Sequence, residues 1–103
     1  MYLQIDTGGK EPVTVFSSNY TSNVSGMWAE ALGYPLSELD RRRAEDAIPE
    51  LRRAAWQMAN NPEKYQAMNP PNGCGNYEGA RDYLVEILNA CLNHPKTTIS
   101  VSR

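Results

Sequence analysis

The sequence has little of what several specialised classes of protein require. Two cysteines, Cys74 and Cys91, and one histidine among 103 residues are too few for a disulfide framework or a conventional zinc site. The net charge of −2 lacks the basic excess of a nucleic-acid binder, so we expect no sequence-specific nucleic-acid partner. No apolar run approaches the roughly 20 residues of a membrane span, and the first residues do not resemble a signal peptide. We therefore expect free thiols, a cytoplasmic location and no membrane partner.

What the sequence does contain is typical of a globular protein. Hydrophobic residues make up 41% and charged residues 21% of the chain, which is close to the average for folded domains. A mass of 11.5 kDa leaves room for one hydrophobic core. We therefore predict a single domain over residues 1–103.

Strand patterns occur at both ends of the chain. Apolar and polar residues alternate over residues 2–6 and again over 13–16, and the glycine- and proline-containing segment 7–12 between them is typical of a hairpin turn. Residues 97–101 are rich in β-branched side chains and alternate in the same way. These segments predict a three-stranded antiparallel sheet, a hairpin plus a C-terminal edge strand.

The middle of the chain has helical patterns. Residues 23–32 carry apolar side chains at helical spacing and are followed by Gly33, a typical residue after a helix end. A second pattern covers 44–60, but an interior proline removes a hydrogen bond, so we favour a start near Ile48 with Pro49 in the first turn.

Two more helices complete the predicted fold. A short one begins at Pro62 and extends to Met68, and the last one is capped by Asn76 and ends at His94, before a proline. We predict an α+β fold in which the small sheet packs against three main helices, with the element order ββααα(short)αβ.

Two polar loops are the candidate binding segments. Residues 69–77 combine prolines, glycines and asparagines before a helix, where main-chain N–H groups favour a polar or anionic ligand. Alternatively, this segment is an ordinary connecting loop whose asparagines form turns and a cap. Residues 17–23 have a similar composition, and the two loops would make a pocket with Trp28 behind it if they converge. The candidate ligand-binding residues are Asn19, Tyr20, Asn23, Trp28, Asn69, Asn72, Gly73, Gly75, Asn76 and Tyr77.

Four arginines are candidates for contacts with phosphate or with a partner's carboxylates: Arg42, Arg43, Arg52 and Arg53. Acidic residues are interleaved with them, so the alternative is a solvated surface with ion pairs between neighbouring turns.

Candidates for catalysis are few. Glu78 and Asp82 share a helix face and could exchange protons, and Cys74 could act as a nucleophile. The single histidine, His94, lies at the far end of the same predicted helix from Cys74, which excludes a Cys–His pair if that helix is straight. We expect no cofactor and no metal.

One pattern resembles a group of small uncharacterised proteins from bacteriophages and their bacterial hosts. It comprises Asn61–Tyr65 and Met68–Pro70, followed by Asn72-Gly73 and the run from Gly75 to Ala80. The segment from Asn19 to Asn23 before a Trp-containing helix is similar to that group as well. Cys74 replaces the aromatic residue expected at its position. The resemblance implies a phage or prophage setting, in which short proteins bind and block host factors.

These observations leave several functions open. The first is a non-enzymatic binding protein, a phage-encoded modulator of host defence that captures a small polar or nucleotide-like ligand. The second is an inhibitor that docks on a host protein through Trp56, Tyr65 or Tyr34, since large aromatics dominate binding hot spots. The third is a small enzyme, and the last strand could also pair with a second copy to form a homo-oligomer.

Overall fold

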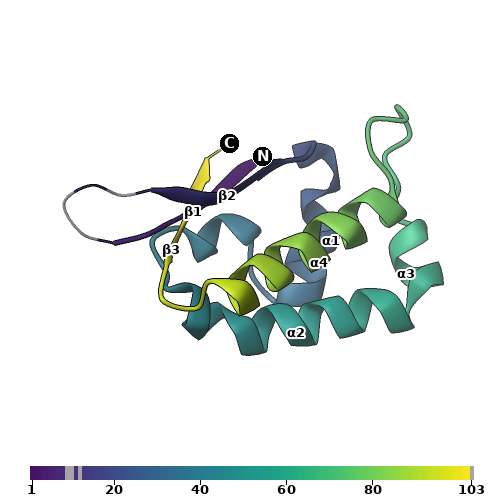
Figure 1. The fold of residues 1–103 in the computed structure, drawn as a ribbon. Helices are drawn as coiled ribbons and strands as arrows, with labels where there is room; N and C mark the ends of the chain where they lie inside the picture. The colour runs from purple at the N-terminus through teal and green to yellow at the C-terminus, as the bar shows by residue number, and fades with distance from the viewer. Residues whose placement is uncertain (9–10, 12, 103) are drawn as a thin grey trace.

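A small antiparallel sheet forms from the two ends of the chain (Figure 1). The computed structural model describes residues 1–8, 11 and 13–102, so much of the expected hairpin turn lies outside the described residues. Strand β1 (Tyr2–Asp6) is central, with β2 (Thr14–Asn19) on one side and β3 (Thr98–Ser102) on the other. Both neighbours are antiparallel to β1, which confirms the predicted sheet.

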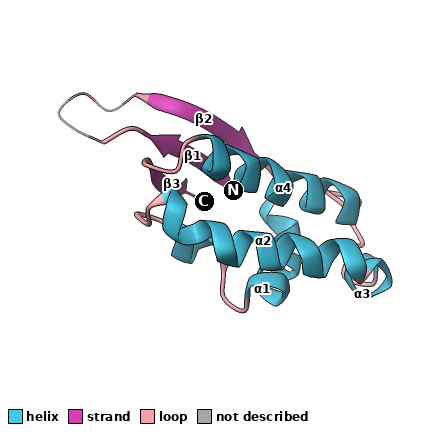
Figure 2. Ribbon diagram, turned by 60° about the horizontal axis from the view of Figure 1, so that its bottom comes forward, coloured by secondary structure: helices cyan, strands magenta, loops and turns pink. Residues whose placement is uncertain are grey.

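The chain between β2 and β3 is mainly helical, and its helices gather on one face of the sheet (Figures 1 and 2). The longest two, α2 and α4, pack along each other. The α+β class and the order ββααα(short)αβ are confirmed. In chain order the helical elements are 3-10 helix η1 (Ser22–Val24), α1 (Ser25–Leu32), 3-10 helix η2 (Leu36–Leu39), α2 (Ala44–Asn60), α3 (Pro62–Gln66) and α4 (Tyr77–Asn93).

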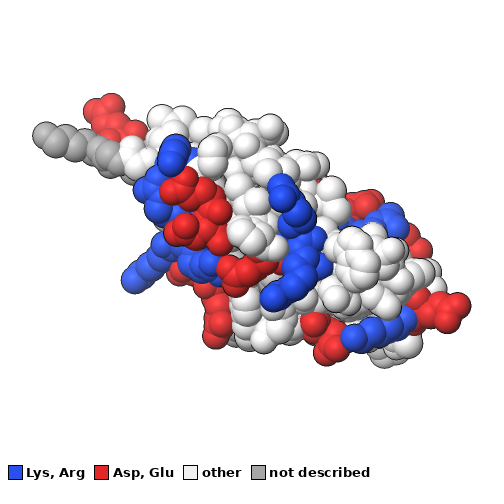
Figure 3. Space-filling view, turned by 90° about the horizontal axis from the view of Figure 1, so that it is seen from below, with Lys and Arg blue, Asp and Glu red and all other residues white. Residues whose placement is uncertain are grey.

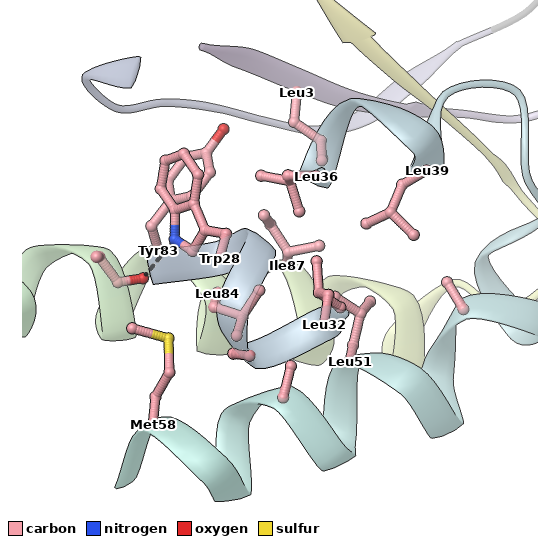
Figure 4. Close-up of a cluster of buried hydrophobic side chains, with 14 of the residues drawn as sticks. Leu3, Trp28, Leu32, Leu36, Leu39, Leu51, Met58, Tyr83, Leu84 and Ile87 are labelled. Carbon is pink, nitrogen blue, oxygen red and sulfur yellow. Dashed lines mark hydrogen bonds between the residues drawn. The ribbon is translucent and has the colours of Figure 1, made fainter. Parts of the chain in front are cut away.

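The hydrophobic core lies between the sheet and the helices. Leu3 and Ile5 of β1 point toward this layer and are fully buried, while Tyr2, Gln4 and Asp6, which alternate with them, face the other side of the sheet. Trp28, Ile87 and Leu51 join them from α1, α4 and α2 (Figure 4). One continuous cluster draws on the central strand and every α-helix.

The start of α1 differs slightly from the prediction. The helix begins at Ser25 rather than at residue 23, because the preceding turn is a 3-10 helix, η1. The side chain of Thr21 caps that turn by accepting a hydrogen bond from the N–H of Asn23 at 3.3 Å. The predicted C-terminal glycine is confirmed, since Gly33 has the left-handed φ of 88°.

The favoured late start of α2 is wrong. The helix begins at Ala44 and contains Pro49 in its interior. The N–H groups of Ala44 and Glu45 donate to the carbonyls of Thr97 and Pro95, at 2.8 and 3.0 Å. These tertiary bonds replace a side-chain cap and hold the first turn in place, which a reading of local propensity does not detect.

The outer edge of β3 is occupied by the chain itself. The N–H of Arg41 donates to the carbonyl of Ile99 at 2.7 Å, and the N–H of Ile99 donates to the carbonyl of Arg42 at 2.8 Å. The carboxylate of Asp40 accepts from the N–H of Val101 at 2.9 Å. The predicted position of this strand at an edge is confirmed, but pairing with a second copy there would have to displace these bonds.

Candidate functional site

The two polar loops meet in the structure. The hydroxyl of Tyr20 accepts a hydrogen bond from the N–H of Asn76 at 3.2 Å. A Cβ atom placed on Gly75 would lie 2.5 Å from Cγ2 of Thr21, so only a glycine allows the loops to approach this closely. The convergence on which the predicted pocket depends is therefore present.

The asparagines of the second loop use their side-chain oxygens within the chain. Asn76 accepts from the N–H of Gly79 at 2.8 Å and caps α4, as predicted. Asn69 accepts from the N–H of Tyr77 at 2.8 Å, and Asn72 accepts from the N–H of Cys74 at 3.0 Å. These bonds favour the interpretation of the segment as a connecting loop built from turns and a cap.

Two of the candidate aromatic residues lie in the core. Trp28 is fully buried, and its indole N–H donates to the carbonyl of Ala80 at 3.1 Å. Tyr77 is 2% exposed, and its hydroxyl donates to the carbonyl of Met58. Both rings are therefore almost fully covered by the rest of the chain.

The ring of Tyr20 fills the place where a pocket was expected. Its centroid lies 6.3 Å from that of Trp28 and 5.9 Å from that of Tyr83. The other candidates lie at the surface: Asn19 ends β2, Asn23 lies in η1, and Gly73 has a left-handed φ of 75° near the loop tip. The loop junction is thus packed around an aromatic group.

A cavity lies next to the first polar loop, with Ser22 in its lining. It has a volume of about 440 Å³ and lies between the start of α1 and the segment that leads into η2. We call it the serine cavity. Its lining comprises Met1, Ser22, Ser25, Gly26, Ala29, Pro35, Leu36 and Ser37.

The side chains that line the serine cavity carry no charge. Leu36 is buried and Ala29 partly buried, so they give the cavity an apolar floor, while Ser22 and Ser25 are exposed at its rim. Within the described part of the chain, the hydroxyls of these two serines have no hydrogen-bond partner. Of the residues that line the cavity, only Ser22 belongs to one of the two polar loops predicted as binding segments. The cavity forms where α1 and η2 pack, and the sequence pattern does not show that packing.

Three of the four candidate arginines bind groups of the chain itself, so the four do not form one patch that is free to bind phosphate. Arg43 pairs with Glu45 at 3.3 Å, and Arg53 donates to the carbonyl of Leu32 at 3.1 Å. Acidic and basic side chains alternate over the face of α2 (Figure 3). Arg52 alone among the four has no partner within the described residues.

Arg42 belongs to a small polar network. Its guanidinium binds the carboxylate of Glu50, which also accepts from the hydroxyl of Tyr34 at 2.7 Å. The bond from Arg42 lowers the pKa of Glu50, while burial and the nearby carboxylate raise the pKa of Tyr34 to about 12. Arg42 therefore holds Glu50 and Tyr34 in place within the fold.

Replacing Glu50 with glutamine is expected to lower stability at pH 7 by up to about 1 kcal/mol, because the pair is only partly buried. A carboxyl with a lowered pKa stabilises the fold above its unfolded pKa of about 4.3, and that contribution disappears as the pH falls. The difference in melting temperature between Glu50→Gln and wild type should therefore shrink between pH 5 and pH 3. Glu63→Gln, at an exposed site of α3, serves as the control, and a pH-independent difference would contradict this account.

The candidate catalytic groups are not brought together. Asp82 pairs with Arg81 at 3.2 Å, Glu78 is exposed in the first turn of α4, and Cys74 is exposed in the loop. Cys91 is buried, which raises the pKa of its thiol to about 11. Across residues 1–8, 11 and 13–102, no three Asp, Glu, His or Cys side chains are placed to hold a metal ion.

The aromatic residues proposed for docking differ in exposure. Tyr65 is 1% exposed and stacks on Tyr77, so the expectation that it is exposed for docking on a partner is wrong: the short helix α3 turns it toward the core. Tyr34 is partly buried in the network with Glu50. Trp56 is 60% exposed on α2, so the docking hypothesis rests on this residue.

Known proteins give no further guidance. No protein-family model, curated protein or solved structure matches the chain. In the part of the chain that the structure describes, every helix is too short or too polar to cross a bilayer.

Proposed function

We propose that this chain is a non-enzymatic binding protein that holds a small, neutral, polar molecule in the serine cavity. The observation that carries the proposal is the cavity itself. Its volume of about 440 Å³ falls in the range of small-molecule sites, roughly 300–1,000 Å³. An apolar floor below hydroxyl groups suits a ligand with one hydrophobic face and several hydrogen-bonding groups, such as a nucleoside or a sugar.

The proposal narrows the ligand class. A phosphate group is disfavoured, because the lining side chains carry no charge and the α-ammonium group of Met1 already donates to the carbonyl of Tyr20. The resemblance to phage and bacterial proteins supports a role in which the chain captures a small molecule of a host and withholds it from a defence system.

The test is to fill the cavity from its floor. Ala29→Leu adds three carbon atoms to a lining residue, while Ala59→Leu makes the same change at an exposed position of α2. Each protein is screened by ligand-observed NMR against a panel of nucleosides and monosaccharides at millimolar concentration. We expect compounds that bind wild type and Ala59→Leu with similar Kd and bind Ala29→Leu at least tenfold more weakly.

Two results would overturn this assignment. One is a panel in which no compound binds the wild-type protein, and the other is an unchanged Kd in Ala29→Leu. Circular dichroism of both variants first establishes that they fold, so that a lost signal reports on the cavity.

A second candidate function is docking on a host protein through α2. The exposure of Trp56 favours it, since a tryptophan that is 60% exposed is uncommon, and Arg52 lies one turn earlier on the same helix face. Tryptophan and arginine are the residues most enriched in binding hot spots.

A further inference from the structure

The two edges of the sheet are not equivalent. The outer edge of β3 is covered by the segment around Arg41, as described above. β2 forms the other edge, and among the described residues no further strand pairs with it (Figure 2). An uncovered edge strand presents main-chain groups that can pair with another extended chain.

The register shows which groups of β2 face outward. The N–H of Tyr20 donates to the carbonyl of Met1, and Ser18 lies opposite Leu3. Bonded and non-bonded pairs alternate along antiparallel strands, so the main-chain groups of Ser17 and Asn19 point away from β1. They offer hydrogen bonds to a fourth strand.

A groove runs beside this edge. Its volume is about 220 Å³, and it lies between β2 and the C-terminal half of α4. A strand added to β2 would point every second side chain toward this groove. The groove is lined by Val15, Phe16, Glu86, Asn89, Ala90, Asn93 and His94.

The charge of the groove selects the occupant. Glu86 is exposed, and no cation lies within ion-pair distance of it among the residues that the structure describes. Asp82, one turn earlier, pairs with Arg81, so Glu86 is the acid of this groove that a partner can neutralise. A symmetric pair of β2 strands from two copies would bring a second Glu86 to the edge, whereas a basic segment would neutralise the one present.

We propose that an extended peptide segment carrying lysine or arginine adds to β2 as a fourth strand. Its main chain bonds to Ser17 and Asn19, an apolar side chain enters the groove beside Phe16, and a basic side chain pairs with Glu86. A groove between an edge strand and a helix is a recurring way in which proteins bind peptides. This site is separate from the serine cavity, and the proposal does not depend on a ligand there.

The experiment uses a phage-displayed library of random ten-residue peptides selected on the wild-type protein. Binding of the selected peptides is then measured by fluorescence polarisation. Ser17→Pro removes an outward-facing N–H and leaves the β1–β2 bonds in place, so we expect binding at least tenfold weaker. Glu86→Lys reverses the groove charge and should have a similar effect, while Glu63→Lys on α3 should change Kd less than twofold.

The selected peptides should be enriched in basic residues that alternate with apolar ones. The proposal is overturned if no peptide is selected, or if the selected peptides bind folded Ser17→Pro and Glu86→Lys as tightly as wild type. A wild-type dimer in light scattering that Ser17→Pro abolishes would also overturn it, because the occupant of the edge would then be a second copy.

Discussion

Replacing Gly79 with alanine is expected to lower the free energy of unfolding by about 2 kcal/mol, because the added methyl group overlaps a packed ring. A Cβ atom at this position would lie 2.0 Å from the hydroxyl oxygen of Tyr20 and 2.6 Å from Cζ. The ring cannot simply move aside, since it packs against Trp28 and Tyr83. The variant therefore has to separate the first loop from the start of α4.

Gly26→Ala provides the matched control, because Gly26 also lies in the first turn of a helix. The nearest atom to its added Cβ is the terminal methyl of Met68, at 3.4 Å, and that side chain is exposed. Alanine favours helix over glycine by up to about 1 kcal/mol, so this variant should be neutral or more stable than wild type. Urea unfolding of both variants checks the pair, and equal stabilities would contradict the packing argument.

Replacing Trp28 with alanine is expected to lower the free energy of unfolding by about 3–5 kcal/mol, the usual range for a buried large aromatic. The side chain is fully buried, its ring centroid lies 5.2 Å from that of Tyr83, and its N–H bonds to Ala80. Domains of this size have a total stability of about 5–15 kcal/mol, so the variant should be close to unfolding at room temperature.

Trp56→Ala is the corresponding change at the surface. Because Trp56 is 60% exposed, its loss should change stability by no more than about 0.5 kcal/mol. Urea unfolding followed by circular dichroism compares the two variants, and a Trp28→Ala protein that is less than 1 kcal/mol weaker than wild type would contradict the placement of Trp28 in the core.

Local patterns predicted the parts of the fold whose causes are local. The alternation in β1, the cap at Asn76 and the end of α1 at Gly33 each follow from a few neighbouring residues. The start of α2 depends instead on carbonyls of Pro95 and Thr97, about 50 residues away, and no local pattern could show that.

The candidate site was less predictable for the same reason. The composition of the two polar loops indicated that they are unusual, but it did not show that Tyr20 fills the space between them. The serine cavity combines the start of α1 with residues 35–37, and its shape depends on how those segments pack. Tyr77 likewise follows directly after the polar loop as the first residue of α4, and the loop composition did not show that its ring is buried in the core.

The most direct test of the proposed function is to map where a panel compound binds. ¹⁵N-labelled protein is titrated with the tightest-binding nucleoside or sugar, and the amide shifts are followed by NMR. The account predicts that the largest changes fall on the amides of residues 22–29 and of Leu36 and Ser37, around the serine cavity. Largest changes on residues 69–77, or on α2 around Trp56, would contradict it and place the binding site elsewhere.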